Sequence, residues 1–142
     1  TLFYRLLADV GFDSGSFEQS SNEDLMAPLL EAYYAPDQLT EAHRQRIGSW
    51  LRLYGHRVLQ DTTADTVRCK RMNHVNPKYV LRNYLAQLAI DKAEQQDFSL
   101  VNELLEVLRK PYDEQPDQEQ YAGKRPDWAR QRAGCSMLSC SS

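Results

Sequence analysis

The sequence has few cysteines and no long apolar run. Its 142 residues include three cysteines, Cys69, Cys135 and Cys140, too few and too unevenly spaced for a secreted disulfide framework. No apolar segment approaches the roughly 20 residues that cross a bilayer, and no signal segment opens the chain. We therefore expect a soluble protein of a reducing compartment, without a membrane partner.

A strong positive charge is also absent. The chain has 17 Lys and Arg against 20 Asp and Glu, a net charge of −3. Because affinity for phosphate backbones comes from clustered Lys and Arg, this balance predicts no nucleic-acid partner. Residues 61–92 are nevertheless basic, with three acidic and six basic residues. We expect this basic stretch to form either a solvated face or a contact with an acidic or phosphate-bearing partner. It contains Arg68, Lys70, Arg71, His74, Lys78 and Arg82.

Catalytic and metal-binding motifs are missing. No histidine has a His or Cys three or four residues further on, so no metal pair forms around His43, His56 or His74. The segment Asp97-Phe98-Ser99 is close to the metal-binding Asp-Phe-Gly of kinases, but it precedes an apolar helical pattern. Asp97 is therefore interpreted as a helix cap. We predict no catalytic, cofactor-binding or metal-binding residue in this chain.

Apolar residues recur at helical spacing through most of the chain, and no segment reads as a strand. The prediction is an all-α fold of about six helices, with residues 1–110 forming a helical domain. A long helix is expected over 39–59, followed by a short one that ends before Pro77. Residues 111–142 lose the periodicity and are predicted to form an irregular, partly disordered tail that ends in Cys-Ser-Ser.

The central helix is predicted over residues 77–94. Asn76 is a strong N-cap, and Pro77 fits the first helical position because its missing N–H has no partner there. One face is broadly apolar, and the opposite face still carries Tyr79 and Ile90. A helix with two apolar sides is expected to pack on both.

The last cysteine lies two residues from the end of the sequence given. A structural cysteine is usually buried in a core, whereas a chain end is commonly exposed. Exposure makes Cys140 a candidate redox thiol, and the residues alone leave an incidental cysteine equally open.

Several short sequence segments, in the same order along the chain, resemble the C-terminal part of the selenoprotein O family, also called the YdiU family. They are residues 76–87 (Asn-Pro-Lys-Tyr-Val-Leu-Arg-Asn-Tyr-Leu-Ala-Gln), 89–91 (Ala-Ile-Asp), 104–108 (Leu-Leu-Glu-Val-Leu), 111–112 (Pro-Tyr), 126–129 (Pro-Asp-Trp-Ala) and 140–142 (Cys-Ser-Ser). The resemblance covers residues 72–142 well and the earlier helices loosely. Because the sequence starts at Thr1 within an apolar pattern, we expect a fragment of a longer protein.

The resemblance implies a protein-kinase-like parent, a pseudokinase that transfers AMP from ATP to protein hydroxyl side chains with Mg or Mn. Transfer of UMP is also attributed to bacterial members. The nucleotide and metal sites of the family lie upstream, so this fragment is expected to be inactive alone. Its partners are then its own upstream catalytic domain and the parent's protein substrates, in the bacterial cytoplasm.

The resemblance also gives roles to particular residues. Cys140 matches the position of selenocysteine in animal members, and in bacterial members this cysteine is thought to pair with one in the catalytic domain. Cys135 is not recognised as a family position. Within this chain a disulfide between Cys135 and Cys140 is a possible substitute for the bond to the catalytic domain. The family pattern has Gly where this chain has Gln96, which should alter a turn between helices. The second face of the central helix is predicted to dock on the catalytic domain, through Tyr79, Arg82, Asn83 and Ile90. The alternative is a non-catalytic interaction module that recruits partners through the basic stretch.

Overall fold

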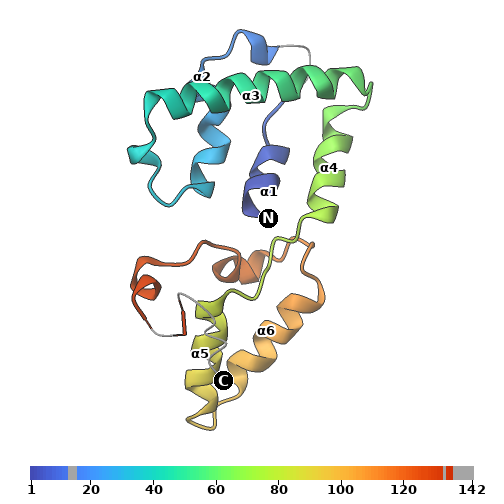
Figure 1. The fold of residues 1–142 in the computed structure, drawn as a ribbon. Helices are drawn as coiled ribbons and strands as arrows, with labels where there is room; N and C mark the ends of the chain where they lie inside the picture. The colour runs from blue at the N-terminus through green and yellow to red at the C-terminus, as the bar shows by residue number, and fades with distance from the viewer. Residues whose placement is uncertain (13–15, 133, 136–142) are drawn as a thin grey trace, which may run out of the picture. The chain divides into compact units, whose positions relative to one another are not determined.

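The computed structural model describes residues 1–12, 16–132, 134 and 135. Over these residues the chain forms six α-helices and five short 3-10 helices, with no strand (Figure 1). This confirms the predicted all-α fold. The chain divides into two compact units, residues Thr1–Asn76 and Pro77–Ser142, each described by itself below.

The first unit is built around one long helix. It contains α1 (Leu2–Ala8), α2 (Asn22–Met26), α3 (Glu41–Gln60) and α4 (Asp65–Val75), with 3-10 turns η1 (Ser16–Glu18), η2 (Ala27–Ala32) and η3 (Pro36–Gln38) between them. Helix α3 lies across α2, and α4 packs beside α1 (Figure 1). The buried core between them contains Leu7, Val10, Phe12, Phe17, Leu25, Met26, Leu29 and Leu51.

The start of α2 is capped by a side chain. Ser21 is the N-cap, and its Oγ accepts a hydrogen bond from the backbone N–H of Asp24 at 3.1 Å. The α-helical part ends at Met26, and the chain continues as the 3-10 helix η2. Pro28 has no N–H to donate to the carbonyl four residues earlier, which accounts for the change of helix type.

Two glycines in α3 allow close packing against neighbouring segments. A Cβ at Gly48 would lie 2.2 Å from the Oδ1 of Asn22. A Cβ at Gly55 would lie 2.7 Å from ring carbons of Phe12 and Phe17. Neither position has room for alanine without displacement of its neighbours.

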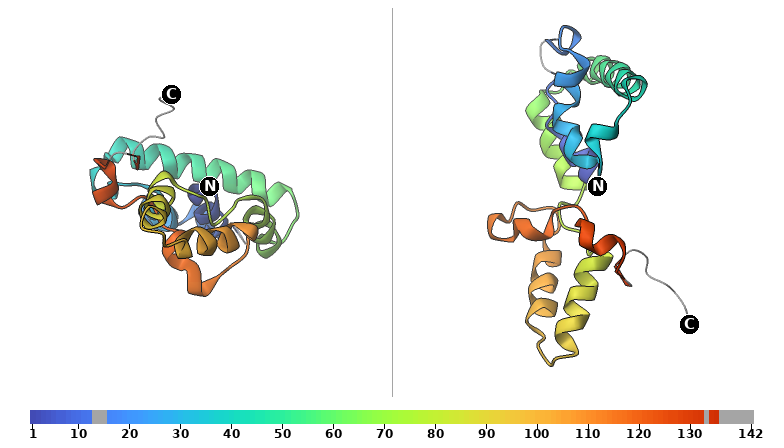
Figure 2. Two further views of the ribbon diagram at one scale, coloured as in Figure 1. Left: turned by 90° about the horizontal axis from the view of Figure 1, so that it is seen from below. Right: turned by 90° about the vertical axis from the view of Figure 1, so that its left-hand side faces the viewer.

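The second unit contains an antiparallel helix pair, α5 (Asn83–Ala93) and α6 (Ser99–Arg109) (Figures 1 and 2). The turn between them is a Schellman motif, with Asp97 N–H donating to Lys92 O and Gln96 N–H donating to Ala93 O, both at 2.9–3.0 Å. Gln96 has φ +61°, so this chain keeps the left-handed turn without glycine. Asp97 acts as the predicted cap, because its Oδ1 accepts from the N–H of Ser99 at 2.9 Å.

The predicted helix start at Asn76 and Pro77 is wrong. Asn76 is the C-cap of α4, and its side chain donates to Met72 O at 2.8 Å. Residues 77–82 are non-helical, and α5 begins at Asn83. The N–H groups of Lys78 and Tyr79 both donate to Pro111 O, at 2.7 and 3.0 Å. These contacts with a distant segment hold the backbone in a non-helical form, and local capping signals cannot reveal them.

The described part of the segment after α6 packs on the helix pair. It contains η4 (Pro116–Tyr121) and η5 (Asp127–Arg130). Its apolar side chains join the second core, which contains Tyr84, Leu85, Ala89, Leu104, Ala129 and Cys135. The boundary between the two units falls after Asn76, whereas a boundary was expected after residue 110. Partial disorder was expected over residues 111–142, of which 133 and 136–142 lie outside the described part, and it stays a prediction.

Candidate functional site

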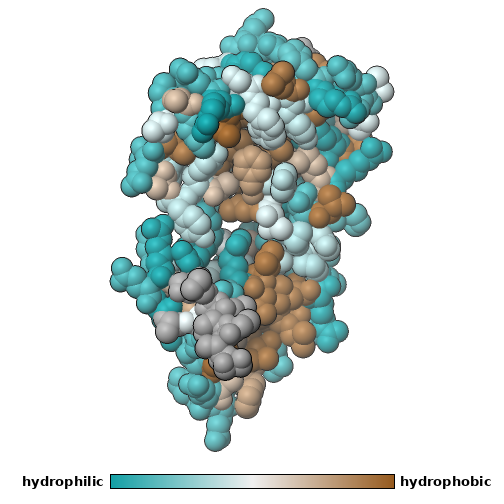
Figure 3. Space-filling view, in the orientation of Figure 1, coloured by the Kyte–Doolittle hydropathy of each residue, from teal (hydrophilic) through white to brown (hydrophobic). Residues whose placement is uncertain are grey.

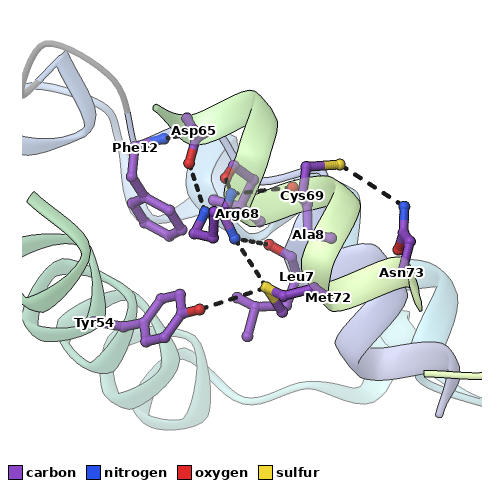
Figure 4. A network of polar contacts seen from close by, with 10 residues as sticks. Leu7, Ala8, Phe12, Tyr54, Asp65, Arg68, Cys69, Met72 and Asn73 are labelled. Atoms are coloured by element: carbon purple, nitrogen blue, oxygen red, sulfur yellow. Dashed lines mark hydrogen bonds and ion pairs between the residues drawn. The ribbon is translucent and has the colours of Figure 1, made fainter. Parts of the chain in front are cut away.

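The centre of the basic stretch is a buried arginine that holds the first unit together. Arg68 on α4 is 9% exposed, and its Nε lies 2.5 Å from Asp65 Oδ1 (Figure 4). Its two Nη atoms donate to Leu7 O at 3.3 Å, Ala8 O at 3.0 Å and Val10 O at 2.7 Å. These carbonyls lie at the end of α1 and just beyond it, where helical partners are lacking. Arg68 therefore caps α1 from a neighbouring helix.

Further contacts complete this network. Asp65 Oδ2 accepts from the N–H of Phe12 at 3.3 Å, and the Arg68 guanidinium lies 5.2 Å from the centre of the Phe12 ring. Met72 Sδ accepts from Arg68 at 3.1 Å and from Tyr54 Oη at 3.6 Å (Figure 4). Burial opposes the charged form of Arg68, but the hydrogen bond and the attraction to Asp65 outweigh it and raise the pKa above its ordinary value. Neither of the environments expected for the basic stretch, a solvated face or a partner contact, holds for Arg68, because it is buried within its own unit.

The other cations of the basic stretch have different environments. In the second unit Lys78 pairs with Glu114 at 2.6 Å and with Glu119 at 2.5 Å, and these bonds raise its pKa against the opposing effect of burial. Lys70 and Arg71 are exposed on α4 and form no ion pair with any described residue. The stretch thus contains two structural cations and two outward-facing ones, in addition to His74 and Arg82.

The four predicted docking residues do not form one helical face. Tyr79 precedes α5, is 1% exposed, and donates through Oη to Gln115 O at 2.9 Å within its own unit. Arg82 also precedes the helix, and its Nη2 donates to Ala122 O at 3.5 Å. Asn83 is half-buried at the helix start, and Ile90 is 50% exposed. The docking geometry fails for Tyr79, and a docking role for the rest of the set stays a prediction.

A different apolar surface emerges on α6. Val101 and Leu105 are both about half exposed, one helical turn apart, and Phe98 is exposed just before the helix. Figure 3 shows a band of apolar surface over this helix. The apolar arc of α6, from Leu100 to Leu108, is wider than the part that the helix pair buries, and this width is visible in the sequence.

The described cysteines are internal or half-buried. Cys135 is 2% exposed and packs in the second core, and Cys69 lies half-buried on α4 with its Sγ 3.8 Å from Asn73 Nδ2. A buried thiol reacts slowly, so Cys135 requires local opening before it can form a disulfide. Cys140, the main redox candidate, lies outside the described residues. Its role stays a prediction.

The described residues form neither a metal-binding cluster nor a membrane-spanning helix. No three acidic, His or Cys side chains gather there in an arrangement that could hold a metal ion. Among the helices of the same residues, none has both the length and the apolar content of a membrane span.

The fold and these surfaces define an all-α segment of two small helical units that keeps apolar and cationic side chains on its outside. Residues 11–109 match the family described as Protein adenylyltransferase SelO, and the chain belongs to this family. The resemblance found in the sequence is thereby confirmed. No solved structure was found to match the chain.

Its relatives are longer proteins named "Protein nucleotidyltransferase YdiU". The whole chain aligns with 27% of the one from Rhodopirellula baltica at 56% identity, and with 25% of the one from Aromatoleum aromaticum at 50% identity. The protein from Flavobacterium johnsoniae is 44% identical over the whole chain and 26% of its own length. The chain therefore spans about a quarter of the length of these relatives.

Proposed function

We propose that this chain is the helical C-terminal part of a bacterial, cytoplasmic protein nucleotidyltransferase, and that it supports a catalytic domain encoded elsewhere in the same polypeptide. One observation carries the proposal: the entire chain aligns with only a quarter of relatives that are named nucleotidyltransferases. The family description favours transfer of AMP from ATP, with UMP as the alternative. The acceptors are hydroxyl side chains of proteins, and the parent has a pseudokinase fold that uses Mg or Mn.

The exposed apolar side chains of the second unit support a role next to another domain. Val101 and Leu105 on α6 are about half exposed. Full burial of a Val or Leu side chain contributes about 1.5–3 kcal/mol, so covering the exposed halves would stabilise a longer protein. The chain itself carries no step of the transfer in this proposal.

A chimera tests whether catalysis depends on a domain outside this chain. The aligned segment of the Rhodopirellula baltica relative is replaced by this chain, and the product is incubated with ATP or UTP labelled at the α-phosphate, Mg or Mn, and a bacterial protein extract. We expect the chimera to label proteins and the isolated 142-residue chain to label none. The preferred nucleotide follows from the ATP and UTP arms. Labelling by the isolated chain would show that the catalytic machinery is within it.

A second candidate function is recruitment of protein substrates through α4. The favouring observation is that Lys70 and Arg71 are exposed and form no ion pair with a described residue. In the chimera, the double variant Lys70→Glu/Arg71→Glu should lose labelling of some proteins and keep others. Arg46→Glu reverses another exposed cation of the same unit and is the matched control. Uniform labelling of all proteins by the double variant would exclude recruitment by α4.

The redox proposal concerns Cys140. In the oxidised full-length parent we expect a disulfide between Cys140 and a cysteine that precedes this chain. Mass spectrometry of nonreduced peptides identifies the partner directly. Cys135 is a poor substitute because it is buried in the second core. A Cys140 thiol that stays free in oxidised protein would contradict the proposed redox role of Cys140.

A further inference from the structure

A small cleft opens between α3 and α4 of the first unit, with a volume of about 180 Å³. Its apolar part is formed by Tyr54 and Val58 on α3 and by Met72 on α4, and Arg57, Asp61 and Arg71 are the charged residues at its exposed edge. Arg68 also lines it, with its hydrogen-bonding groups already directed to Asp65 and to the end of α1.

The apolar part of the cleft is held in place by its neighbours. The Tyr54 ring stacks on Trp50 with centroids 5.6 Å apart and planes at 15°, and it meets Phe12 edge-on at 5.3 Å. Its Oη donates to Met72 Sδ across the cleft at 3.6 Å. This hydrogen bond links α3 and α4 within the lining of the cleft.

The charged edge has one cation in excess. Arg57 pairs with Asp61 at 2.5 Å, and Arg68 pairs with Asp65 at 2.5 Å. Arg71 is exposed and forms no ion pair with a described residue. Its guanidinium therefore keeps its donors available to an anion next to an apolar surface.

We propose that this cleft binds a carboxylate carried on a short apolar stem, with the stem on Tyr54, Val58 and Met72 and the carboxylate accepting hydrogen bonds from Arg71. A volume of about 180 Å³ leaves room for a group the size of butyrate or of a glutamate side chain. The source is either a free organic acid or a Glu side chain of a partner protein. The proposal goes beyond nucleotide transfer and does not depend on it.

The test is an NMR titration of the 15N-labelled 142-residue chain with three probes: butyrate, its neutral analogue butyramide, and a capped Gly/Ser peptide that contains one Glu. We expect saturable amide shifts in residues 54–63 and 68–72 with butyrate, and none with butyramide. If the peptide binds at least about 10-fold more tightly than butyrate, the source is a protein side chain; if not, it is a free acid. No saturable shift with either acid, or equal shifts with butyramide, would overturn the proposal.

Two variants on α4 locate the anion. Arg71→Gln should weaken butyrate binding by about 10-fold or more, equivalent to about 1.4 kcal/mol. Lys70→Gln removes the neighbouring exposed cation, which does not line the cleft, and should change the affinity less than about 2-fold. Both residues are exposed, so both variants should fold, which the amide spectrum itself shows. Equal loss in both variants would mean that the basic helix attracts anions without a specific site.

Discussion

Replacement of Arg68 by methionine should destabilise the first unit severely. The variant keeps the length of the side chain but removes the Arg68 donors from Asp65 and from the carbonyls of Leu7, Ala8 and Val10. Asp65 then keeps only the N–H of Phe12, and Leu7 O keeps the N–H of Val10. Removal of one partner from a buried ion pair costs about 3–5 kcal/mol. Since small domains have free energies of unfolding of about 5–15 kcal/mol, this loss is a large part of the total.

Urea unfolding monitored by tryptophan fluorescence measures the effect. The chain has two tryptophans, so a Trp128→Phe background leaves Trp50 as the reporter of the first unit. With a slope of about 1–3 kcal/mol/M, a loss of about 3–5 kcal/mol lowers the midpoint by roughly 1–5 M or leaves no folded baseline. Arg71→Met, on the exposed part of the same helix, is the control and should stay within about 0.5 kcal/mol.

The pair with Asp65 provides an independent check. The double variant Asp65→Asn/Arg68→Met removes the uncompensated charge, so it should be more stable than the sum of the single changes predicts. Arg68→Lys should be intermediate, because one ammonium cannot reach all the acceptors of the guanidinium. An Arg68→Met midpoint equal to that of the Arg71→Met control would show that the buried network contributes nothing, and the capping argument would be refuted.

Three further predictions concern stability. Gln96→Gly should stabilise the second unit by about 0.5–1 kcal/mol in thermal unfolding, because Gln96 occupies the left-handed region at φ +61°, and Gln96→Ala should give no such gain. Gly55→Ala should destabilise the first unit by about 1–3 kcal/mol in urea, since its Cβ would meet two phenylalanine rings at 2.7 Å; Ala at Gly123, which has open space around it, is the control. Hydrogen bonds from the side chain and N–H of Ser99 lower the pKa of Asp97 below 3.8, so its contribution is present above that pH and is lost as the pH falls through the lowered pKa. Urea midpoints of Asp97→Ala should therefore approach those of the unsubstituted chain once the pH has fallen below the lowered pKa of Asp97, and a difference that stays constant with pH would contradict the linkage.

Local signals in the sequence predicted the features that depend on neighbouring residues. Asp97 makes the hydrogen bond expected of a helix cap, and Ser21, a residue type favoured at N-caps, caps α2. The all-α class followed from periodicity alone. These successes share a cause, because caps and packing faces are determined within a few residues along the chain.

The errors arose where distant contacts override local preference. The residue types of Asn76 and Pro77 are typical of a helix start. Pro111 O, however, accepts hydrogen bonds from the N–H groups of Lys78 and Tyr79, which keeps this backbone out of a helix. Arg68 looked like a solvated cation because its acceptors lie about 60 residues earlier in the chain. The spacing of Asp65 and Arg68 at i and i+3 was a readable sign of the ion pair, although it gave no sign of the carbonyls of α1.

The basic stretch shows why net charge is a weak guide to binding. A buried cation with several acceptors, such as Arg68, stabilises a fold, whereas an exposed cation without an ion-pair partner, such as Arg71, is available to a ligand. Reversal of all the charges together would unfold the first unit and would be misread as loss of binding. Only variants confined to Lys70 and Arg71 separate the two effects, because these positions can change charge without leaving a buried group unpaired.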